Sequence, residues 1–170
     1  MQEVSVVIPN FNGMAYLDGV LSSLERQTIR NFEVILVDNG STDGSCAFVS
    51  AEYPWVHMIQ LPENYGFSRA VNEGIRAARS PYVLLLNNDT EAEPDFLEEM
   101  VAALRRHKKA FSCQAKMIQL HDRDKMDDAG NYYCALGWAF ARGKGKDIHS
   151  CESEDKIFTS CAGAAIYRKK

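Results

Sequence analysis

Four short clusters of polar residues carry the side chains best suited to chemistry, and each cluster follows an apolar run. The clusters are residues 9–13, 38–41, 62–66 and 87–90, and they are rich in Asn, Asp, Gly and Pro. Turns and helix caps use the same residue types, so a single cluster has a purely structural explanation. Four clusters after four successive apolar runs favour a shared binding site instead.

Asp89 is the candidate metal ligand among these residues. Its carboxylate is a hard oxygen ligand of the kind that holds Mg²⁺ or Mn²⁺, with waters and substrate phosphates completing the octahedron. One carboxylate and a diphosphate suffice for such a site. The alternative is that Asp89 only caps the helix predicted after it.

Asp38 is the candidate for recognition of a nucleoside. Its carboxylate could accept hydrogen bonds from a nucleobase N–H or from ribose hydroxyls, a charge-assisted contact worth roughly 1.5 to 3 kcal/mol when partly buried. The alternative is an Asx-turn, in which the side chain bonds the nearby backbone.

The elements that must position these residues follow from the hydrophobic pattern. Short apolar runs predict strands over Val4–Ile8, Val34–Val37, Val56–Leu61 and Tyr82–Leu86. Helical spacing of apolar residues predicts helices around 17–24, 43–53, 67–78 and 96–104. This alternation is typical of an α/β fold with a mostly parallel sheet and helices on both faces. Ligands of such sheets bind beyond the carboxyl ends of the strands, where the four polar clusters fall.

Residues 111–170 follow a different pattern from residues 1–110. They carry scattered charges, paired Tyr132 and Tyr133, and a Gly-Lys-Gly-Lys stretch at 143–146, without a sustained period. We expect loops and short strands that cover one end of the sheet, within a single domain overall.

Composition and charge argue against several classes of protein. With 170 residues, 46% hydrophobic and 25% charged, the chain is long enough for one globular domain with its own core. The 19 Lys and Arg against 23 Asp and Glu give a formal charge of −4, so we expect no nucleic-acid partner. No apolar run could span a bilayer and no signal-peptide pattern is visible, which predicts a cytoplasmic protein. Association with a membrane surface stays open.

Other sequence signatures of chemistry are missing. Five cysteines without C-x-x-C spacing predict reduced, structural thiols. The sequence has neither a P-loop nor G-x-G-x-x-G after the first strand, which argues against P-loop nucleotide triphosphatases and dinucleotide-dependent oxidoreductases. The acidic stretch from His121 to Asp128 lacks metal-ligand spacing, so we expect a charged surface loop there.

Five longer segments become visible when the polar clusters are taken with their neighbours. They are Val-Ser-Val-Val-Ile-Pro-Asn-Phe-Asn (4–12), Glu-Val-Ile-Leu-Val-Asp-Asn-Gly-Ser-Thr-Asp (33–43), Asn-Tyr-Gly-Phe-Ser-Arg-Ala-Val-Asn-Glu-Gly (64–74), Leu-Leu-Leu-Asn-Asn-Asp-Thr (84–90) and Cys-Ala-Gly-Ala-Ala (161–165). Together they resemble the family 2 glycosyltransferases of the GT-A fold, and look most like bacterial rhamnosyltransferase-like members. One segment alone is a weak match, but five in order across most of the chain are highly specific.

The resemblance implies a Rossmann-like GT-A sheet and a sugar-transfer reaction. A UDP- or dTDP-linked sugar would pass to an acceptor hydroxyl with inversion, aided by Mg²⁺ or Mn²⁺. The acceptor would be a glycan or a lipid-linked glycan in polysaccharide or cell-envelope synthesis, at the inner face of the membrane. Residues 1–110 would form the donor-binding half, and residues 111–170 would begin the acceptor-side half.

The resemblance also implies roles for residues near the donor nucleotide. Pro9 and Phe11 would flank the base, and Asp38 would hydrogen-bond it. Arg69 and Asn72, on the helix after Gly66, would lie near the donor. For Arg69 and Asn72, the alternative is an exposed helix face.

At the fourth cluster, the resemblance implies that Asn88 contacts the donor and that Asp89 binds the metal, as the last member of a D-x-D-like motif. Gly163 and Ala164 would line the acceptor side. The motif here is Asn87-Asn88-Asp89, whose two amides carry no charge, so we expect weak metal affinity without a bound diphosphate.

The general base of the family is a carboxylate expected shortly after the segment that ends here at Lys170. We therefore expect the base to lie beyond residue 170, with this chain a piece of a larger enzyme or a natural truncation that binds donor but transfers sugar poorly. Glu152, Glu154 and Asp155 precede the Cys-Ala-Gly segment and are not assigned as the base.

Two other functions stay open from the residues. A nucleotidyltransferase uses a similar sheet and a metal-binding aspartate, but residues 10–13 lack the basic, Gly-rich loop expected after its first strand. A non-catalytic nucleotide- or protein-binding module would use the same rim without chemistry.

Overall fold

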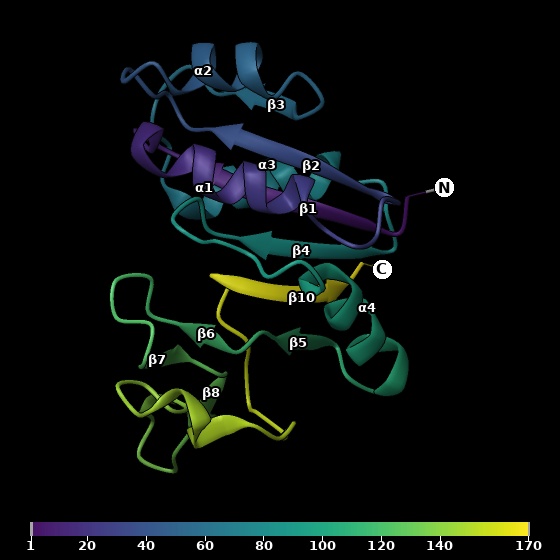
Figure 1. Ribbon diagram of the computed structural model, residues 1–170, viewed down its shortest axis with the longest axis vertical. Helices are drawn as coiled ribbons and strands as arrows, with labels where there is room; N and C mark the ends of the chain where they lie inside the picture. Colours follow the sequence, from purple (N-terminus) through teal and green to yellow (C-terminus); the bar gives the residue numbers. More distant parts are fainter. Residues whose placement is uncertain (1, 170) are drawn as a thin grey trace.

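A six-stranded sheet forms the centre of the molecule in the computed structural model, which describes residues 2–169 (Figure 1). Its strand order is β3-β2-β1-β4-β10-β5. These strands are β1 (Val4–Asn10), β2 (Phe32–Asp38), β3 (His57–Gln60), β4 (Tyr82–Leu86), β5 (Ser112–Gln114) and β10 (Ala164–Arg168). The four predicted strands are confirmed as β1 to β4, with ends shifted by a few residues.

The parallel part of the sheet runs from β3 through β2 and β1 to β4. Its central strands are buried on both faces, as their continuous apolar runs predict. The register pairs Asn10 of β1 with Asp38 of β2, so that these two strands end at the same level. That alignment brings the polar residues after both strands to one edge.

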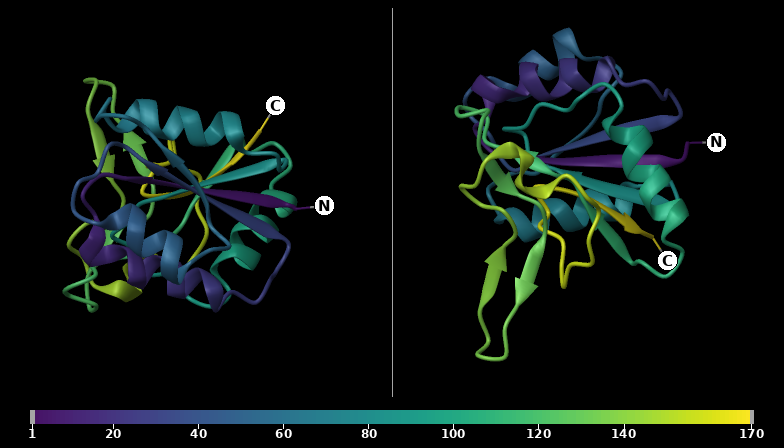
Figure 2. Two further views of the ribbon diagram at one scale, coloured as in Figure 1. Left: turned by 90° about the horizontal axis from the view of Figure 1, so that it is seen from above. Right: turned by 60° about the horizontal axis from the view of Figure 1, so that its bottom comes forward.

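Helices cover both faces of the sheet, as predicted (Figure 2). They are α1 (Met14–Glu25), α2 (Ser45–Glu52), α3 (Phe67–Ala77) and α4 (Phe96–Arg106). The apolar sides of α1, α2 and α4 pack on the face that includes Val6, Leu36 and Leu84. α3 packs alone on the other face, against Val7 and Ile35.

Gly74 lets α3 approach the sheet closely. A Cβ atom at this position would lie 2.2 Å from Cγ1 of Val7 and 3.2 Å from Cγ2 of Val37. Since real contacts between carbon atoms are near 3.5 to 4.0 Å, any side chain here would push the helix away from β1 and β2. The close contact at Gly74 therefore fixes the position of α3 relative to β1 and β2.

β10 runs antiparallel to both of its neighbours, β4 and β5. It lies between β4 and β5, and the sheet is therefore mostly parallel, as the fold class requires. Arg168 in this strand holds the end of α4: its Nε donates to the carbonyl of Ala110 at 2.9 Å, and its Nη2 donates to the carbonyl of Leu104. Arg168 of β10 thus holds the C-terminal end of α4 in place.

Short elements extend beyond β5, at the end of the molecule farthest from β3 (Figure 1). They are β6 (Met117–Ile118), β7 (Met126–Asp128), β8 (Asn131–Tyr133), β9 (Ala139–Ala141) and the 3₁₀ helix η1 (Ile148–Cys151). β6 pairs with β7 and β8 pairs with β9, each in a separate two-stranded sheet. The expected loops and short strands are confirmed. Within residues 2–169, no helix has the length and apolar character needed to cross a membrane.

Candidate functional site

A chain of side-chain hydrogen bonds joins the carboxyl ends of three neighbouring strands. Asn10 of β1 donates from Nδ2 to Oδ1 of Asp38 at the end of β2, at 2.9 Å. Asn88, after β4, donates from Nδ2 to Oδ1 of Asn10 at 2.8 Å. The structure therefore brings the second and fourth polar clusters of the sequence together at one edge, with Asn10 between them.

Asp38 is almost completely buried, with 2% of its surface exposed. Its Oδ1 accepts from Asn10 and its Oδ2 accepts the backbone N–H of Ser41 at 2.9 Å, which is the Asx-turn alternative of the sequence. Burial by itself raises the pKa of Asp38, but hydrogen bonds from Ser41, Asn10 and the Cys46 thiol outweigh it and hold the pKa below its ordinary value. Asp38 is thus a buried carboxylate that organises the loop after β2.

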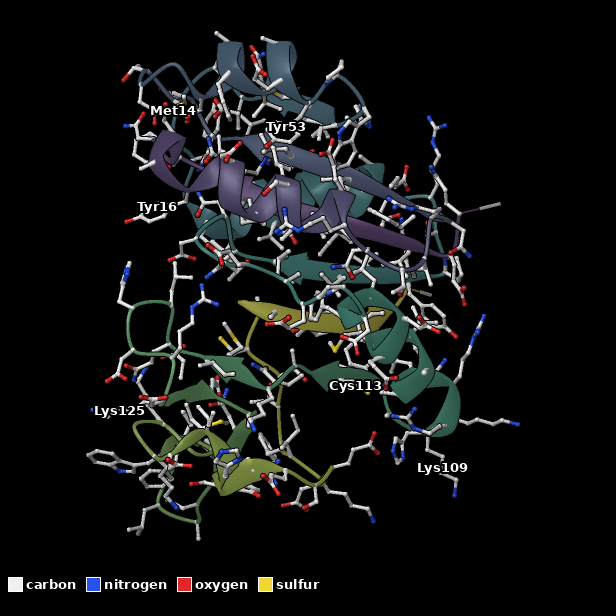
Figure 3. All side chains as sticks on the ribbon, viewed as in Figure 1. Met14, Tyr16, Tyr53, Lys109, Cys113 and Lys125 are labelled. Carbon is white, nitrogen blue, oxygen red and sulfur yellow. The ribbon has the colours of Figure 1, made fainter. Side chains whose placement is uncertain are left out.

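The loops after β1 and β2 are bound to each other. The Oγ of Ser41 accepts the backbone N–H of Asn12 at 2.8 Å, and Oδ1 of Asn12 accepts the backbone N–H of Thr42 at 2.9 Å. Asp43 accepts the N–H of Met14 at 2.9 Å. Met14 is the first residue of α1 and is labelled at that end of the helix in Figure 3. These bonds fix the loop that carries Phe11, whose side chain is 47% exposed beside half-buried Pro9.

The loop after β3 is attached to the same edge through Asn39. This buried side chain donates to Oδ1 of Asn64 at 2.8 Å and accepts the backbone N–H of Tyr65 at 3.0 Å. Gly40, with φ +78°, allows the close approach: a Cβ there would lie 2.7 Å from the backbone of Glu63. All four polar clusters therefore belong to one connected rim.

Gly13 leaves room for the hydrogen-bond chain at the start of α1. A Cβ atom on Gly13 would lie 2.1 Å from Nδ2 of Asn88 and 2.4 Å from Oδ1 of Asn10. Both of those atoms belong to the bond between Asn88 and Asn10. A glycine is needed here for space, since its φ of −104° is open to any residue.

Asp89 is exposed and follows Asn88 directly, so it lies at this same rim. Asn88 uses its Nδ2 on Asn10, and its side-chain oxygen accepts no hydrogen bond from the described residues. The described residues contain no group of three His, Cys, Asp or Glu side chains that could hold a metal ion by themselves. The donor set fits a Mg²⁺ or Mn²⁺ ion that takes its remaining ligands from water and a phosphate.

Gly163 and Ala164 lie at the start of β10, next to the end of β4. The carbonyl of Gly163 accepts the backbone N–H of Asn87 at 2.9 Å, and both Gly163 and Ala164 are buried. They therefore adjoin the Asn87-Asn88-Asp89 segment from the side of residues 111–170.

Arg69 and Asn72 are on α3 and stand apart from the hydrogen-bond chain. Both are exposed, and Arg69 forms an ion pair with Glu73 one turn further along, with 2.8 Å between Nε and Oε1. Arg69 lies in the first turn after Gly66 and so is near the carboxyl edge, whereas Asn72 lies in the second turn. Among the described residues, no side-chain hydrogen bond joins either of them to Asp38, Asn10 or Asn88.

Two residues central to the rim, Asn10 and Ser41, had no assigned role in the sequence analysis. Both lie inside the polar clusters, where they are easily taken for turn formers. The signal for Asn10 is its place at the last position of a buried strand, where a polar amide needs partners.

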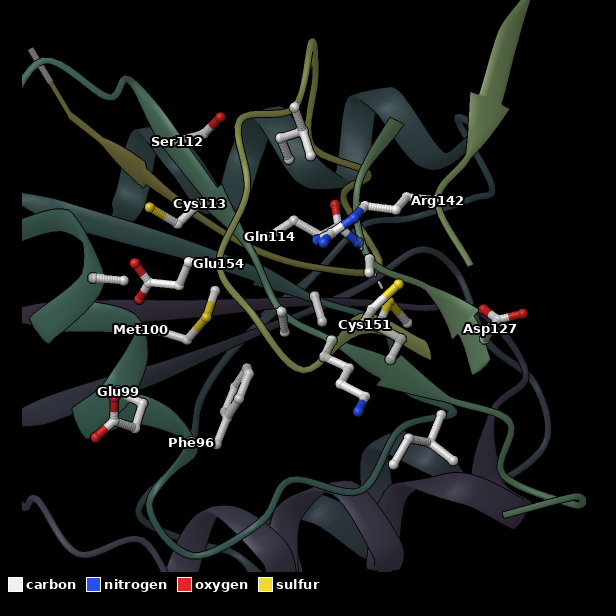
Figure 4. Close-up of a pocket in the computed structure, with 18 of the residues that line it drawn as sticks. Phe96, Glu99, Met100, Ser112, Cys113, Gln114, Asp127, Arg142, Cys151 and Glu154 are labelled. Atoms are coloured by element: carbon white, nitrogen blue, oxygen red, sulfur yellow. Dashed lines mark hydrogen bonds between the residues drawn. The ribbon is translucent and has the colours of Figure 1, made fainter. Parts of the chain in front are cut away.

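A large cleft opens from the rim toward residues 111–170 (Figure 4). Its volume is about 2020 Å³, and Asp89, Asn87 and Ala164 are among its lining residues. α4 forms one wall, through Phe96 and Met100, and β5, β6 and residues 151–159 form the other. Asp38 is not among the residues that line the cleft.

Glu154 lines this cleft and connects residues 151–159 to the end of α4. Its carboxylate contacts Nη2 of Arg106, and Nε2 of His107 lies 2.8 Å from its Oε2. The hydrogen bond from His107 and the contacts of Arg106 hold the pKa of Glu154 below its ordinary value. A carboxylate engaged in this way is suited to holding the segment 151–159 in place.

Curated relatives are glycosyltransferases of bacteria. TuaG of Bacillus subtilis, a proposed glycosyltransferase of teichuronic acid biosynthesis, is 29% identical over 128 residues, which are 73% of this chain and 50% of TuaG. An uncharacterized glycosyltransferase of Haemophilus influenzae is 33% identical over 141 residues, 80% of this chain and 50% of that protein. The chain spans about half the length of these relatives.

Solved structures with the same fold include TarS and a mannosyltransferase. TarS of S. aureus superposes with a TM-score of 0.65 at 26% identity, over 72% of this chain and 23% of TarS. TarS residues 1–349 were solved with UDP-GlcNAc, and that structure gives a TM-score of 0.62 over 68% of this chain and 34% of its own. The mannosyltransferase PcManGT of Pyrobaculum calidifontis, solved with GDP-Man and Mn²⁺, has a TM-score of 0.66 at 17% identity and shows the fold alone, over 98% of this chain and 44% of that protein.

A family model described as glycosyl transferase family 2 matches residues 5–170, which include the whole rim and the cleft. The chain belongs to glycosyl transferase family 2.

Proposed function

We propose that the carboxyl-edge rim binds the nucleotide of a nucleoside diphosphate sugar, and that the sugar passes to an acceptor in the adjoining cleft with inversion at the anomeric carbon. The observation that carries the proposal is the fixed Asp38–Asn10–Asn88 chain, which ends next to exposed Asp89 at the mouth of the cleft. Family membership and the UDP-sugar bound to TarS support a UDP- or dTDP-linked donor.

The base and ribose would lie over the loops after β1 and β2. Exposed Phe11 and half-buried Pro9 offer an apolar surface for a base. Asp38 supports this surface indirectly, because its carboxylate accepts hydrogen bonds from Ser41 and Asn10. A direct contact between Asp38 and a base requires one of these hydrogen bonds to be exchanged. A rim that is ordered before the nucleotide arrives loses little entropy on binding.

The diphosphate would lie at Asp89, with Arg69 and Asn72 on α3 as further candidates for donor contact. Arg69 is exposed, and it would give up its surface ion pair with Glu73 to bind a phosphate. The free energy lost would be small, because ion pairs exposed to water contribute little. Mg²⁺ or Mn²⁺ held by Asp89 and Asn88 would neutralise the charge that develops on the diphosphate leaving group.

The acceptor side would be the cleft between α4 and β5, starting at Gly163 and Ala164. Its volume of about 2020 Å³ leaves room for a glycan or a lipid-linked glycan. The relationship to TuaG supports a role in cell-envelope glycan synthesis, which we place at the inner face of the membrane. Glu154 is engaged with Arg106 and His107 and is no candidate for the general base, which we place outside residues 1–170.

Isothermal titration calorimetry with UDP and with dTDP, each with Mn²⁺, tests the donor site. We expect one nucleotide to bind and Asp89→Ala to weaken binding at least tenfold, with an unchanged unfolding midpoint because Asp89 is exposed. Asp124→Ala is the matched control, an exposed aspartate of the β6–β7 turn, and should bind like the unchanged chain. Absence of heat with both nucleotides in a folded sample would refute the proposal.

The same titration separates a metal-dependent donor site from a nucleotide-binding module that needs no metal. A module that needs no metal would bind nucleotide equally well with EDTA and after Asp89→Ala. Such a result would leave the rim as a nucleotide site and remove the metal from the proposal.

A further inference from the structure

The side-chain amide of Asn88 has a fixed direction in the rim. An asparagine amide offers a donor, Nδ2, at one end and an acceptor, Oδ1, at the other. Asn88 donates from Nδ2 to Oδ1 of Asn10 at 2.8 Å, and Asn10 donates from its own Nδ2 to Oδ1 of Asp38 at 2.9 Å. Both amides therefore donate in the same direction, toward Asp38.

Asp38 sets this direction because an ionised carboxylate can only accept hydrogen bonds. Burial raises the pKa of Asp38, but the hydrogen bonds to its oxygens hold the pKa below the ordinary value, so the group is ionised at neutral pH. Asn10 must then turn its Nδ2 toward Asp38, which leaves its Oδ1 for Asn88. A reversed Asn88 amide would bring two oxygens together at this contact.

The packing around the two amides holds them in this direction. Asn10 is 2% exposed and uses both ends of its amide. A Cβ atom on Gly13 would lie 2.1 Å from Nδ2 of Asn88 and 3.2 Å from its Cγ, so the nitrogen end of the Asn88 amide is turned toward Gly13. The start of α1 and the end of β1 therefore enclose the donor end of Asn88.

The acceptor end of the Asn88 amide is accessible and has no partner among the described residues. Within residues 2–169, Oγ of Ser80 is the one buried side-chain nitrogen or oxygen without a hydrogen bond in a residue that is not itself exposed. Asn88 is half-buried, so its unpartnered Oδ1 must reach solvent. An accessible amide oxygen directly before Asp89 in the chain is a hard ligand of the kind that Mg²⁺ and Mn²⁺ accept.

We propose that Asn10 is a positioning residue for the divalent ion of the donor site: by holding Nδ2 of Asn88, it makes Oδ1 the side-chain atom that Asn88 offers to the ion. The inference rests on the proposed function and adds to it a residue that acts through Asn88. An amide turned the other way would place an N–H donor against a cation. Hydrogen-bond partners behind a metal ligand commonly change metal affinity 10–100-fold when they are removed.

Calorimetry of UDP and dTDP binding by the whole chain, once with Mn²⁺ and once with EDTA, tests this role. We define the metal factor as the dissociation constant in EDTA divided by the dissociation constant in Mn²⁺. Asn10→Ala should lower the metal factor about tenfold, because the Asn88 amide is then free to turn. Asn88→Ala should lower it at least as far. A metal factor that Asn10→Ala leaves unchanged would overturn the proposal.

The two substitutions together show whether Asn10 acts through Asn88. In the double variant the metal factor should equal that of Asn88→Ala, because no amide is left to position. Losses that multiply would mean that Asn10 affects the ion independently of Asn88, which is contrary to the proposal.

Asn10→Asp separates positioning from stability. The new carboxylate can still accept Nδ2 of Asn88, but it cannot donate to Asp38 and places a second negative charge beside it. Stability should therefore fall at least as far as in Asn10→Ala, whereas the metal factor should stay at or above that of the unchanged chain. A metal factor that falls together with stability in this variant would count as evidence for a purely structural role.

Asn39→Ala is the matched control, and it decides the question if Asn10→Asp does not fold. Asn39 is 3% exposed and holds Asn64 and Tyr65 of the loop after β3. The substitution removes a buried amide from the same rim without touching Asn88, so stability should fall while the metal factor stays unchanged. Equal losses of the metal factor in Asn39→Ala and Asn10→Ala would overturn the proposal.

Failure of this inference is distinguishable from failure of the donor site. A folded chain that binds neither nucleotide contradicts the donor site and this inference together. A chain whose nucleotide binds more tightly with Mn²⁺, and equally so after Asn10→Ala, contradicts this inference alone.

Discussion

Asn88 donates its side-chain N–H to Oδ1 of Asn10 across 2.8 Å, and this bond joins the ends of β4 and β1. Asn10 passes the connection on to Asp38 through its own Nδ2. Asn10→Ala should lower the free energy of unfolding by about 1–3 kcal/mol, because a buried carboxylate and an amide each lose a partner. Urea unfolding followed by circular dichroism measures this change.

The control for that substitution is Asn72→Ala, which removes an exposed amide from α3. Its unfolding free energy should stay within about 0.5 kcal/mol of the original chain. Equal losses for the two variants would contradict a special role for Asn10.

Asp38 predicts a particular dependence of stability on pH. Its pKa is lowered in the folded state, so its stabilising contribution is present above the unfolded pKa and is lost as the pH falls through the folded pKa. Asp38→Asn should be less stable than the original chain at pH 7, and the difference between the two should shrink as the pH is lowered below about 4. Urea midpoints between pH 7 and pH 3 measure the difference, and a constant gap would count against the argument.

Gly13 and Gly19 offer a matched pair of glycine substitutions. Gly13→Ala should destabilise the chain by about 1–3 kcal/mol, because the new methyl group would overlap with Asn88 and Asn10. Gly19→Ala lies inside α1 with its nearest neighbour, Glu91, at 3.5 Å, and should raise stability by up to about 1 kcal/mol through helix propensity. Thermal unfolding of both variants tests the contrast, which disappears if the rim has room for a methyl group.

Cys46 should be the least reactive thiol near the rim. Burial, together with the Asp38 carboxylate, raises the pKa of Cys46 to about 11, so that only on the order of 0.1% is thiolate at pH 8. Cys161 is exposed. Iodoacetamide at pH 8, followed by peptide mass spectrometry, should modify Cys161 first and leave Cys46 unmodified while the chain is folded. Early modification of Cys46 would show that its environment is open.

The parallel core and its rim could be predicted from the sequence because their signals are local. A run such as Leu84 to Leu86 predicts a buried strand, and the polar residues after it must fall at the carboxyl edge. The pairing of Asn10 with Asp38 was within reach by the same logic, since both residues end neighbouring strands. What the pattern lacks is the direction of each side chain, so it does not show that the Asp38 oxygens accept hydrogen bonds from Asn10 and Ser41. Contact of Asp38 with a nucleoside stays a prediction.

β10 had no comparable signal. Ala164 and Ala165 have low intrinsic preference for strands, and the pairing of β10 with β4 joins residues 78 positions or more apart. Such a contact leaves no period in the sequence. The hairpin from Asn131 to Ala141 was equally hidden, because its apolar residues face solvent and follow no buried face.

The antiparallel pairing of β10 with β4 has a consequence for folding during translation. Val83 and Leu85 have their backbone partners on β1 from the first hundred residues, but the other side of β4 is completed only when residues 164–168 leave the ribosome. At about 5–20 residues per second, translation leaves this edge open for on the order of several seconds. During that interval the unpaired edge of β4 can pair with a strand of another nascent chain. Molecular chaperones that cover this edge during translation would therefore increase the yield of folded protein.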